Sequence, residues 1–491
     1  MVEIITVENN LKQKTVSSLT WMLIEKGGRA FVELLIQIVM ARLLAPEQFG
    51  ALAIMFVFVN VGNVIVQSGF NMALVQSPEV DFDDCSTVFW LSLVVSIILY
   101  AGTFTCAPLI ARFYSMDFIV WPLRVLALIL VVNSFNAVQV AIVQRALELR
   151  KVFNATIVSV VASGVIGVAS AFAGAGLWAL VAQQLSYQVC NCVILAFQVR
   201  WRPRLVFKVR RVRELFSFGW KLLISGLLTQ GYQSLSDLVI GRQFSASQLG
   251  LVSQGKKYPQ AIGSMLDGAI QPVMLSAVAH VQDDIAYVKR LIRRALKTST
   301  YLTVPCMALF ALVTEPTIRL LLGEQWLPAV PFMQMYCFIY ALLPIHTSNL
   351  QALNGMGRSD LFLKLELIKK AYGITFILVG AFVFQNVYIL VGSYMLAGII
   401  GTFVNAWPNR KVIGYSYLEQ ARDICPAFVL AAVSAAVAFP IGMLSLPDIV
   451  MIVLQAAVMA ACYLGLSKLF KVEALDYLLK TAKEVIARKK G

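Results

Sequence analysis

The sequence predicts an all-α polytopic membrane protein with about 14 transmembrane helices. Three observations lead to this fold class. The 491 residues are 59% hydrophobic and only 14% charged, whereas soluble domains carry about 25% charged residues. Apolar stretches of about 20 residues recur along the chain, and each is long enough to cross roughly 30 Å of hydrocarbon. The basic residues between these stretches fall almost entirely on alternate loops.

A polar N-terminal segment precedes the first span, and no cleavage site of the secretory type follows that span. We therefore expect the first span itself to target the chain to the membrane. An even number of spans places both termini on one side. The expected spans, of which the fourth, seventh and eighth are the least clearly bounded, are 16–41, 51–75, 87–111, 119–143, 153–173, 177–198, 216–240, 250–279, 298–314, 328–353, 365–384, 387–407, 425–444 and 449–467.

The distribution of basic residues gives the orientation. Of the 41 Lys and Arg residues, 29 fall on the side of the termini, four fall on the other side and eight lie inside apolar segments. The four are Arg42, Arg112, Arg242 and Arg319. Loops rich in Lys and Arg stay in the cytoplasm, so both termini are predicted to be cytoplasmic. A missed span would exchange alternate loops and remove this contrast, so the partition also supports fourteen spans.

An internal repeat divides the chain. The segment from Arg42 to Gly50 is echoed by the segment from Arg242 to Gly250 at an offset of 200 residues. Six spans separate the copies, and an even number preserves orientation, so the halves are predicted to be parallel repeats. The predicted domains are an N-terminal six-helix lobe at 1–205, a C-terminal six-helix lobe at 206–410, and two further helices with a basic tail at 411–491.

Charged residues inside the spans are the candidates for a binding cavity. Each costs about 2.5–3.5 kcal/mol at the bilayer centre, so such residues normally face a partner or a cavity. The basic set is Lys26, Arg29, Arg124, Lys221, Lys256, Lys257, Lys369 and Lys370, and the acidic set is Glu25, Glu33, Asp237, Asp267 and Glu366. The basic excess favours an anionic ligand, with the acidic residues as candidates for ion coupling.

The first span holds the densest group of these charges. Glu25, Arg29 and Glu33 are spaced to share one helix face, and Lys26 lies beside them. Two interpretations remain open. The group is either a self-neutralising stripe buried between helices, or the wall of a water-filled cavity whose cations meet an anionic substrate.

Amide side chains form a second set of candidates, for contacts with sugars. They are Asn60, Asn63, Gln67 and Asn71 in the second span, and Gln184 and Gln188 in the sixth. Hydrogen bonds between helices explain these residues equally well. In the eighth span, Gly255 and Pro259 flank two lysines and predict a broken helix that lines a site. The alternative is that this span begins later and the lysines lie at the interface. The same doubt applies to Lys369 and Lys370.

Several classes of function are excluded or disfavoured. The loops are too short to hold a soluble domain, and no P-loop motif is present, which excludes an attached ATPase. Asp81-Phe-Asp83 matches the metal-binding pattern of glycosyltransferases, but we expect only a solvated acidic turn there. His280 and His346 lie far apart in the sequence and do not form a metal-ligand pattern. We expect no catalytic residue, no metal, no cofactor and no nucleic-acid partner.

Three segments carry a resemblance to a known family. They run from Arg319 to Pro331, from Ala352 to Asp360 with the following Leu-Glu-Leu-Ile-Lys-Lys, and from Ala41 to Gly50. In order and spacing they resemble the polysaccharide transporter family, in its colanic-acid-exporter-like branch of lipopolysaccharide biosynthesis flippases. That family belongs to the multidrug/oligosaccharidyl-lipid/polysaccharide flippase superfamily. The resemblance covers essentially the whole chain and implies two six-helix lobes plus two helices.

The resemblance implies a function and partners. It implies a flippase that moves undecaprenyl-diphosphate-linked oligosaccharide repeat units across the bacterial inner membrane by alternating access, for exopolysaccharide, capsule or O-antigen assembly. Lys26 and Arg29 fit the diphosphate site best. Polysaccharide polymerase and chain-length proteins are implied partners, and the cytoplasmic cations are expected to bind anionic lipid headgroups.

Two rival functions remain. A cation-coupled multidrug antiporter of the same superfamily should have a net acidic cavity, whereas the charges here lean basic. A membrane polymerase or ligase of lipid-linked glycans usually needs a large extracytoplasmic loop, and the loops here are short. The glycan, the coupling ion and the oligomeric state are not determined by the sequence.

Overall fold

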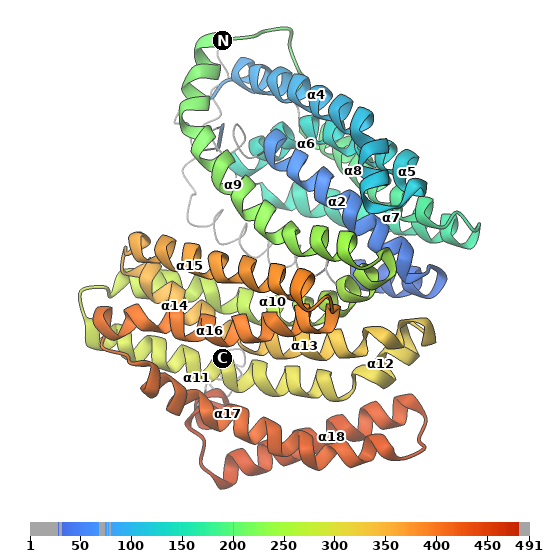
Figure 1. Cartoon of the computed structure of the whole chain (residues 1–491). Coiled ribbons are helices and arrows are strands. Elements are labelled where there is room, and N and C mark those ends of the chain that lie inside the picture. The colour runs from blue at the N-terminus through green and yellow to red at the C-terminus, as the bar shows by residue number, and fades with distance from the viewer. Residues whose placement is uncertain are drawn as a thin grey trace, which may run out of the picture. The chain divides into compact units, whose positions relative to one another are not determined.

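The computed structural model describes residues 28, 32–67, 74–75, 77, 80–146, 148–199 and 201–480. Within these residues the fold is helical, without a strand (Figure 1). The chain forms two compact units, Met1–Gly250 and Leu251–Gly491, and each is described by itself. The domain boundaries at 205 and 410 were drawn from the repeat, and they stay a prediction.

The first unit is a bundle in which α6 packs against α4, α8 and α2, and α7 packs along α8. Helix α9 packs against α2 and α4. Residues 32–43 are helical and precede the first complete helix. The elements are α2 (Pro46–Gln67), α4 (Phe82–Tyr114), η1 (Asp117–Ile119), α5 (Val120–Leu126), α6 (Leu128–Arg145), α7 (Leu149–Phe172), α8 (Leu177–Gln198) and α9 (Val209–Gln243).

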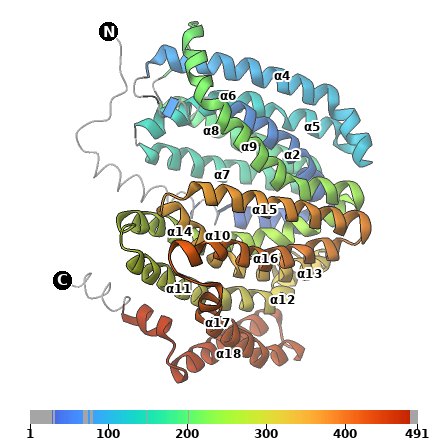
Figure 2. The same ribbon diagram turned by 60° about the vertical axis from the view of Figure 1, so that its left-hand side comes forward.

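The second unit contains most of α10, which begins at Ala246, and all later helices. Helix α11 packs against α13, α14 and α17, and α17 packs against α18 (Figure 2). The elements are α10 (Ala246–His280), α11 (Ile285–Leu312), α12 (Thr314–Leu321), η2 (Glu324–Ala329), α13 (Val330–Ala341), α14 (Leu343–Gly355), α15 (Ser359–Leu378), η3 (Val379–Val383), α16 (Val387–Val412), α17 (Tyr417–Ala438), η4 (Phe439–Met443) and α18 (Asp448–Leu469).

Many of these helices have the length and composition of membrane spans. Among the described residues, ten helical segments meet both conditions, which makes the chain a multi-pass membrane protein. Helices α9, α10 and α15 are also long enough but are not among these ten. In α15, Lys364, Glu366, Lys369 and Lys370 follow one another closely. The exact number of fourteen spans stays a prediction.

The broken helix predicted at Gly255–Pro259 is wrong, because α10 runs without interruption from Ala246 to His280. The glycine serves close packing instead. A Cβ atom added to Gly255 would lie 2.9 Å from the Cβ of Phe332 and 3.1 Å from the amide nitrogen of Met333. Proline is tolerated inside membrane helices because neighbouring helices satisfy the freed backbone groups.

The Gly-x-x-Trp segment, part of the resemblance, has a plain structural role. Gly323 follows α12 with φ of 98°, a left-handed conformation that favours glycine. The chain then turns into η2, which places the Trp326 side chain in the core with no exposed surface. Pro331 occupies the first turn of α13, where its missing N–H costs nothing. The motif therefore builds a buried corner between two helices.

The two repeated segments, Arg42–Gly50 and Arg242–Gly250, contact each other, and each makes the same kind of contact with the other. The first turns of α2 and α10 meet at two glycines. A Cβ atom on Gly50 would lie 1.7 Å from the carbonyl oxygen of Ala246, and one on Gly250 would lie 1.9 Å from that of Pro46. Each glycine thus faces the first residue of the other helix, so the repeated sequence serves a single reciprocal contact.

Candidate transport site

The candidates in the first span fall mostly outside the described residues. Lys26, Arg29 and Glu25 belong to this group, and Asn71 of the second span also lies outside the described residues. Glu33 is described, is half-buried and has an interaction partner. The two interpretations of this span therefore stay open, and the diphosphate site at Lys26 and Arg29 stays a prediction.

Arg124 lies against aromatic rings near the end of α4. Its Nε donates a 3.1 Å hydrogen bond to the carbonyl oxygen of Phe104, and its guanidinium lies 4.2 Å from the Phe104 ring centre and 4.8 Å from that of Trp121. The Trp121 side chain is 61% exposed. An Arg beside exposed aromatic residues close to a helix end is typical of the membrane interface. These contacts favour an anchoring role for Arg124 over a role in a substrate site.

The amide candidates in the first unit divide into two kinds. Asn63 on α2 accepts a 2.8 Å hydrogen bond from Nδ2 of the buried Asn133 on α6, so it joins two helices. This contact favours the structural interpretation for Asn63. The others, Asn60, Gln67, Gln184 and Gln188, are half-buried, and their role in sugar contacts stays a prediction.

Two lysines of the candidate set have no counter-charge among the described residues. Lys221 on α9 is exposed and Lys256 on α10 is half-buried. Within the described part of the chain, no ion pair joins either lysine to a carboxylate. Lys257 is exposed, and like Asp237 and Lys370 it has an interaction partner. Both lysines lie in predicted spans, where an uncompensated cation is costly, so they stay candidates for contact with an anion.

Glu366 and Lys369 on α15 form an ion pair one helical turn apart. Both side chains are largely buried, with 28% and 19% exposed surface. Each therefore neutralises the other, which lowers the cost of placing them in a membrane helix. This pairing leaves neither residue as a strong candidate for a separate role.

Asp267 on α10 is the most buried of those candidate carboxylates that the structure describes, with 8% exposed surface. Its Oδ2 accepts a 2.8 Å hydrogen bond from the hydroxyl of Thr347 on α14. Its Oδ1 has no hydrogen-bond partner among the described residues. A buried carboxylate with one unsatisfied oxygen is placed to hold a proton or a cation.

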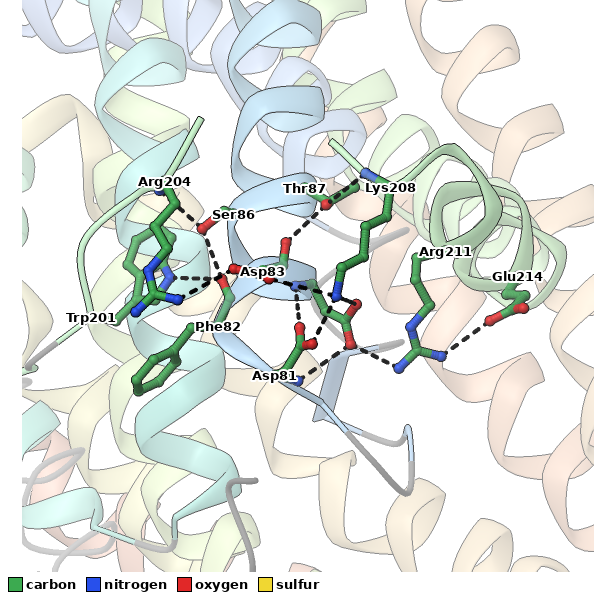
Figure 3. A network of polar contacts seen from close by, with 11 residues as sticks. Asp81, Phe82, Asp83, Ser86, Thr87, Trp201, Arg204, Lys208, Arg211 and Glu214 are labelled. Carbon is green, nitrogen blue, oxygen red and sulfur yellow. Dashed lines mark hydrogen bonds and ion pairs between the residues drawn. The ribbon is translucent and has the colours of Figure 1, made fainter. Parts of the chain in front are cut away.

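The structure also contains a polar cluster that the sequence analysis missed, at the beginning of α4 (Figure 3). Here the segment before α9 runs along the first turns of α4. The amides of Arg204 and Lys208 donate 3.1 Å hydrogen bonds to the hydroxyls of Ser86 and Thr87. The indole of Trp90 donates a 2.8 Å bond to the carbonyl of Arg204. These contacts attach the connector between α8 and α9 to the beginning of α4.

Ion pairs reinforce this attachment. Asp84 has only 4% exposed surface and contacts Lys208 at 3.4 Å and Arg211 at 2.8 Å. Asp81 contacts the Lys208 ammonium at 2.7 Å, and Arg211 also pairs with Glu214. Burial alone would lower the pKa of Lys208, but its hydrogen bond to Asp81 and the charges of both carboxylates raise it above its ordinary value. Lys208 therefore stays charged and paired.

The acidic turn at Asp81–Asp84 was expected to be only a solvated turn, and this expectation is corrected in part. Asp81 caps α4 by accepting a hydrogen bond from the Asp84 amide, and the carboxylates bind the basic connector. The described residues contain no group that could hold a metal ion. The missed signal was charge complementarity, because an acidic run and seven basic residues at 199–213 share one predicted side.

A second cluster lies at the beginning of α11. Arg293 forms two 2.7 Å hydrogen bonds to the carboxylate of Asp423 on α17, and Lys297 contacts the same carboxylate at 3.1 Å. Tyr415 donates a 2.7 Å hydrogen bond to it as well. Burial, followed by this hydrogen bond, raises the pKa of Tyr415 well above its ordinary value. Lys297 also pairs with Glu473 beyond α18.

The two clusters have opposite charge arrangements. In the first unit, the transmembrane helix α4 carries the acidic residue Asp84, and the connector side carries Arg211. In the second unit, the transmembrane helix α11 carries Arg293. The partner residue Asp423 lies on α17, which follows the short segment after α16. Each unit thus ties the start of one helix to the segment that leads out of a predicted six-helix lobe.

Comparison with known proteins decides the family. The model of a family described as polysaccharide biosynthesis protein matches residues 39–331, more than half of the chain. The chain belongs to this family. A succinoglycan biosynthesis transport protein of Rhizobium meliloti (strain 1021) is 24% identical over 417 residues, covering 84% of this chain and 82% of that protein. A lipopolysaccharide biosynthesis protein of Escherichia coli (strain K12) is 23% identical over 440 residues, covering 88% of each.

Solved structures share the fold of this polysaccharide biosynthesis protein. A lipid II flippase in an inward closed conformation superposes with a TM-score of 0.74 at 12% identity, covering 93% of this chain and 100% of that one. An inward-facing multidrug transporter of the MOP superfamily has a TM-score of 0.56 at 15% identity, covering 79% of this chain and 98% of that one. The predicted family is confirmed, and so is the all-helical membrane fold.

Proposed function

We propose that this protein is a flippase for undecaprenyl-diphosphate-linked oligosaccharide repeat units. It would act at the bacterial inner membrane, with both termini in the cytoplasm, and serve exopolysaccharide, capsule or O-antigen assembly. Its family and its relatives, one of them named as a succinoglycan biosynthesis transport protein and another as a lipopolysaccharide biosynthesis protein, support a polysaccharide precursor as the cargo. Alternating access between two six-helix lobes is the proposed mechanism, and polymerase and chain-length proteins are proposed partners.

An anionic cargo is favoured mainly by one observation. Some positive charges in the predicted spans have no compensating carboxylate. Lys221 and Lys256 have no carboxylate partner in the described part of the chain, whereas Glu366 is neutralised by Lys369. A diphosphate crosses hydrocarbon only if charged hydrogen-bond donors replace its water. Lys26 and Arg29 add two further cations in the first span. A multidrug antiporter for cations would not benefit from this arrangement.

The double variant Lys26→Gln/Arg29→Gln tests the proposed diphosphate site. We expect flipping to fall by tenfold or more, because each hydrogen bond to a charged group is worth about 1.5–3 kcal/mol. The measurement uses proteoliposomes and an undecaprenyl diphosphate that carries a short fluorescent oligosaccharide. Arg124→Gln is the matched control, because it removes an intramembrane cation that contacts aromatic rings. Normal flipping by the double variant would exclude the site, and no flipping by the wild type would exclude the function.

Asp267 is the proposed coupling carboxylate, because it is buried and one of its oxygens lacks a partner. Asp267→Asn keeps the shape and an oxygen that accepts from Thr347, but it cannot take up a proton. We expect the variant to fold and to lose the stimulation of transport by a proton gradient. The measurement compares flipping with and without that gradient, with Glu366→Gln as control. Stimulation equal to that of the wild type would contradict this role for Asp267.

A further inference from the structure

A cavity of about 980 Å³ opens in the second unit where α11 begins and α18 ends. Its walls come from Arg293, Lys297 and Tyr301 on α11, from residues 421–430 on α17, and from residues 470–474, which follow α18. The proposed transport function uses none of these lining residues. Ligand pockets usually occupy about 300–1,000 Å³, so this cavity is large enough for a substantial part of a small molecule.

Part of the cavity lining is basic. Arg293, Lys297, Arg422 and Lys471 contribute four cations, and Asp423 and Glu473 contribute two carboxylates. The carboxylates are already engaged by Arg293 and Lys297. Arg422 and Lys471 are exposed, and neither has an ion-pair partner among the described residues. The positive charge left in this part of the lining is therefore available to an anion.

Much of the remaining lining is apolar. It includes Pro426, Val429 and Leu430 on α17 and Phe470 beyond α18. Val429 is 52% exposed and Phe470 is 67% exposed. These residues belong to, or directly follow, helices with the composition of membrane spans. The apolar lining residues are thus placed where lipid chains can reach them.

We propose that this cavity is a binding site for an anionic phospholipid of the surrounding membrane. The phosphate would contact Arg422 and Lys471, and an acyl chain would lie along Val429 and Phe470. Basic pockets between transmembrane helices are the usual sites of acidic lipid headgroups. The bound lipid would hold α17 and α18 against α11. This site gives a specific location to the lipid contacts expected from the overall charge.

Charge also argues against the chain's own C-terminal segment as the occupant. Residues 481–491 contain four basic residues and one acidic residue. A cationic segment would be repelled by Arg422 and Lys471, whereas an anionic headgroup would be attracted. A zwitterionic lipid would gain less, since its positive group would face the same cations.

Cys425 provides a direct measurement, because it lines the cavity and is a free, exposed thiol. The full-length protein is placed in nanodiscs of phosphatidylcholine, with or without phosphatidylglycerol. The rate of maleimide labelling of Cys425 is then followed by peptide mass spectrometry. Cys106 on α4, which is also free and exposed, serves as internal control. We expect phosphatidylglycerol to slow labelling of Cys425 at least fivefold and to leave Cys106 unchanged.

The double variant Arg422→Gln/Lys471→Gln should lose this protection. The matched control is Arg410→Gln/Lys411→Gln, which removes two exposed cations at the end of α16 that do not line the cavity. This control should keep the protection. Equal labelling with and without phosphatidylglycerol would overturn the proposal, and so would protection that survives in Arg422→Gln/Lys471→Gln. Protection by undecaprenyl diphosphate alone would assign the cavity to the cargo instead and would also overturn it.

Discussion

Gly50→Ala is expected to destabilise the protein severely, and Gly250→Ala should do the same. The new methyl group would lie 1.7 Å from a backbone oxygen in the first case and 1.9 Å in the second. Backbone atoms cannot move aside as a flexible side chain does, so the two helices must separate. Overpacking in a well-packed interior costs about 1–3 kcal/mol and occasionally more. We expect values at or above the upper end, measured as thermal unfolding of the purified protein.

The control for this prediction is Gly102→Ala or Gly231→Ala. Both glycines lie in helices, and a Cβ atom on either would meet nothing within 4 Å. Alanine is favoured over glycine inside a helix by about 0.5–1 kcal/mol, so these variants should unfold at the same temperature or higher. Gly50→Ala with wild-type stability would show that α2 and α10 do not meet through these glycines.

Asp423→Ala is expected to destabilise the second unit strongly. The variant loses the acceptor of two bonds from Arg293, one contact from Lys297 and one bond from Tyr415. Removing one partner from a buried ion pair costs about 3–5 kcal/mol. Arg293 is half exposed and recovers some hydration, so we expect a loss near the lower end. The loss is measured by thermal unfolding in detergent.

Two further variants make this prediction specific. Asp423→Asn keeps the shape and one acceptor oxygen, so its loss should be smaller than that of Asp423→Ala. Asp360→Ala removes a carboxylate from an exposed ion pair with Arg358, and exposed pairs contribute little. We expect that variant to unfold like the wild type. Equal losses at positions 360 and 423 would contradict a special role for the buried cluster.

The sequence predicted the helical membrane fold well because apolar length and charge distribution report directly on a membrane environment. The predicted spans at 87–111 and 177–198, for example, fall inside α4 and α8. It predicted α10 less well, because Gly255 and Pro259 usually signal a helix break and here serve packing. Packing against Phe332, which lies in a different helix, is not visible in local sequence.

The site residues were harder to predict than the fold. A local pattern shows that Asn63 and Arg124 lie in apolar spans, but it does not show the partners that define their roles. Asn63 meets Asn133 and Arg124 meets Phe104, each from another helix. The polar cluster at the beginning of α4 was not predicted for the same reason, because Asp84 and Arg211 are far apart in the chain. Tertiary contacts, which single-sequence patterns do not encode, distinguish an anchor from a binding residue.

The basic residues of the connector at 199–213 act differently during membrane insertion and in the folded protein. During insertion, Lys and Arg orient a chain while Asp and Glu contribute little, so Arg204, Lys208 and Arg211 act then as free cations. In the folded protein these three residues are paired with Asp83, Asp81 and Asp84. Their charge is thus available to the translocation machinery while the chain is being inserted, and it is withdrawn from the membrane surface once α4 and α9 have met.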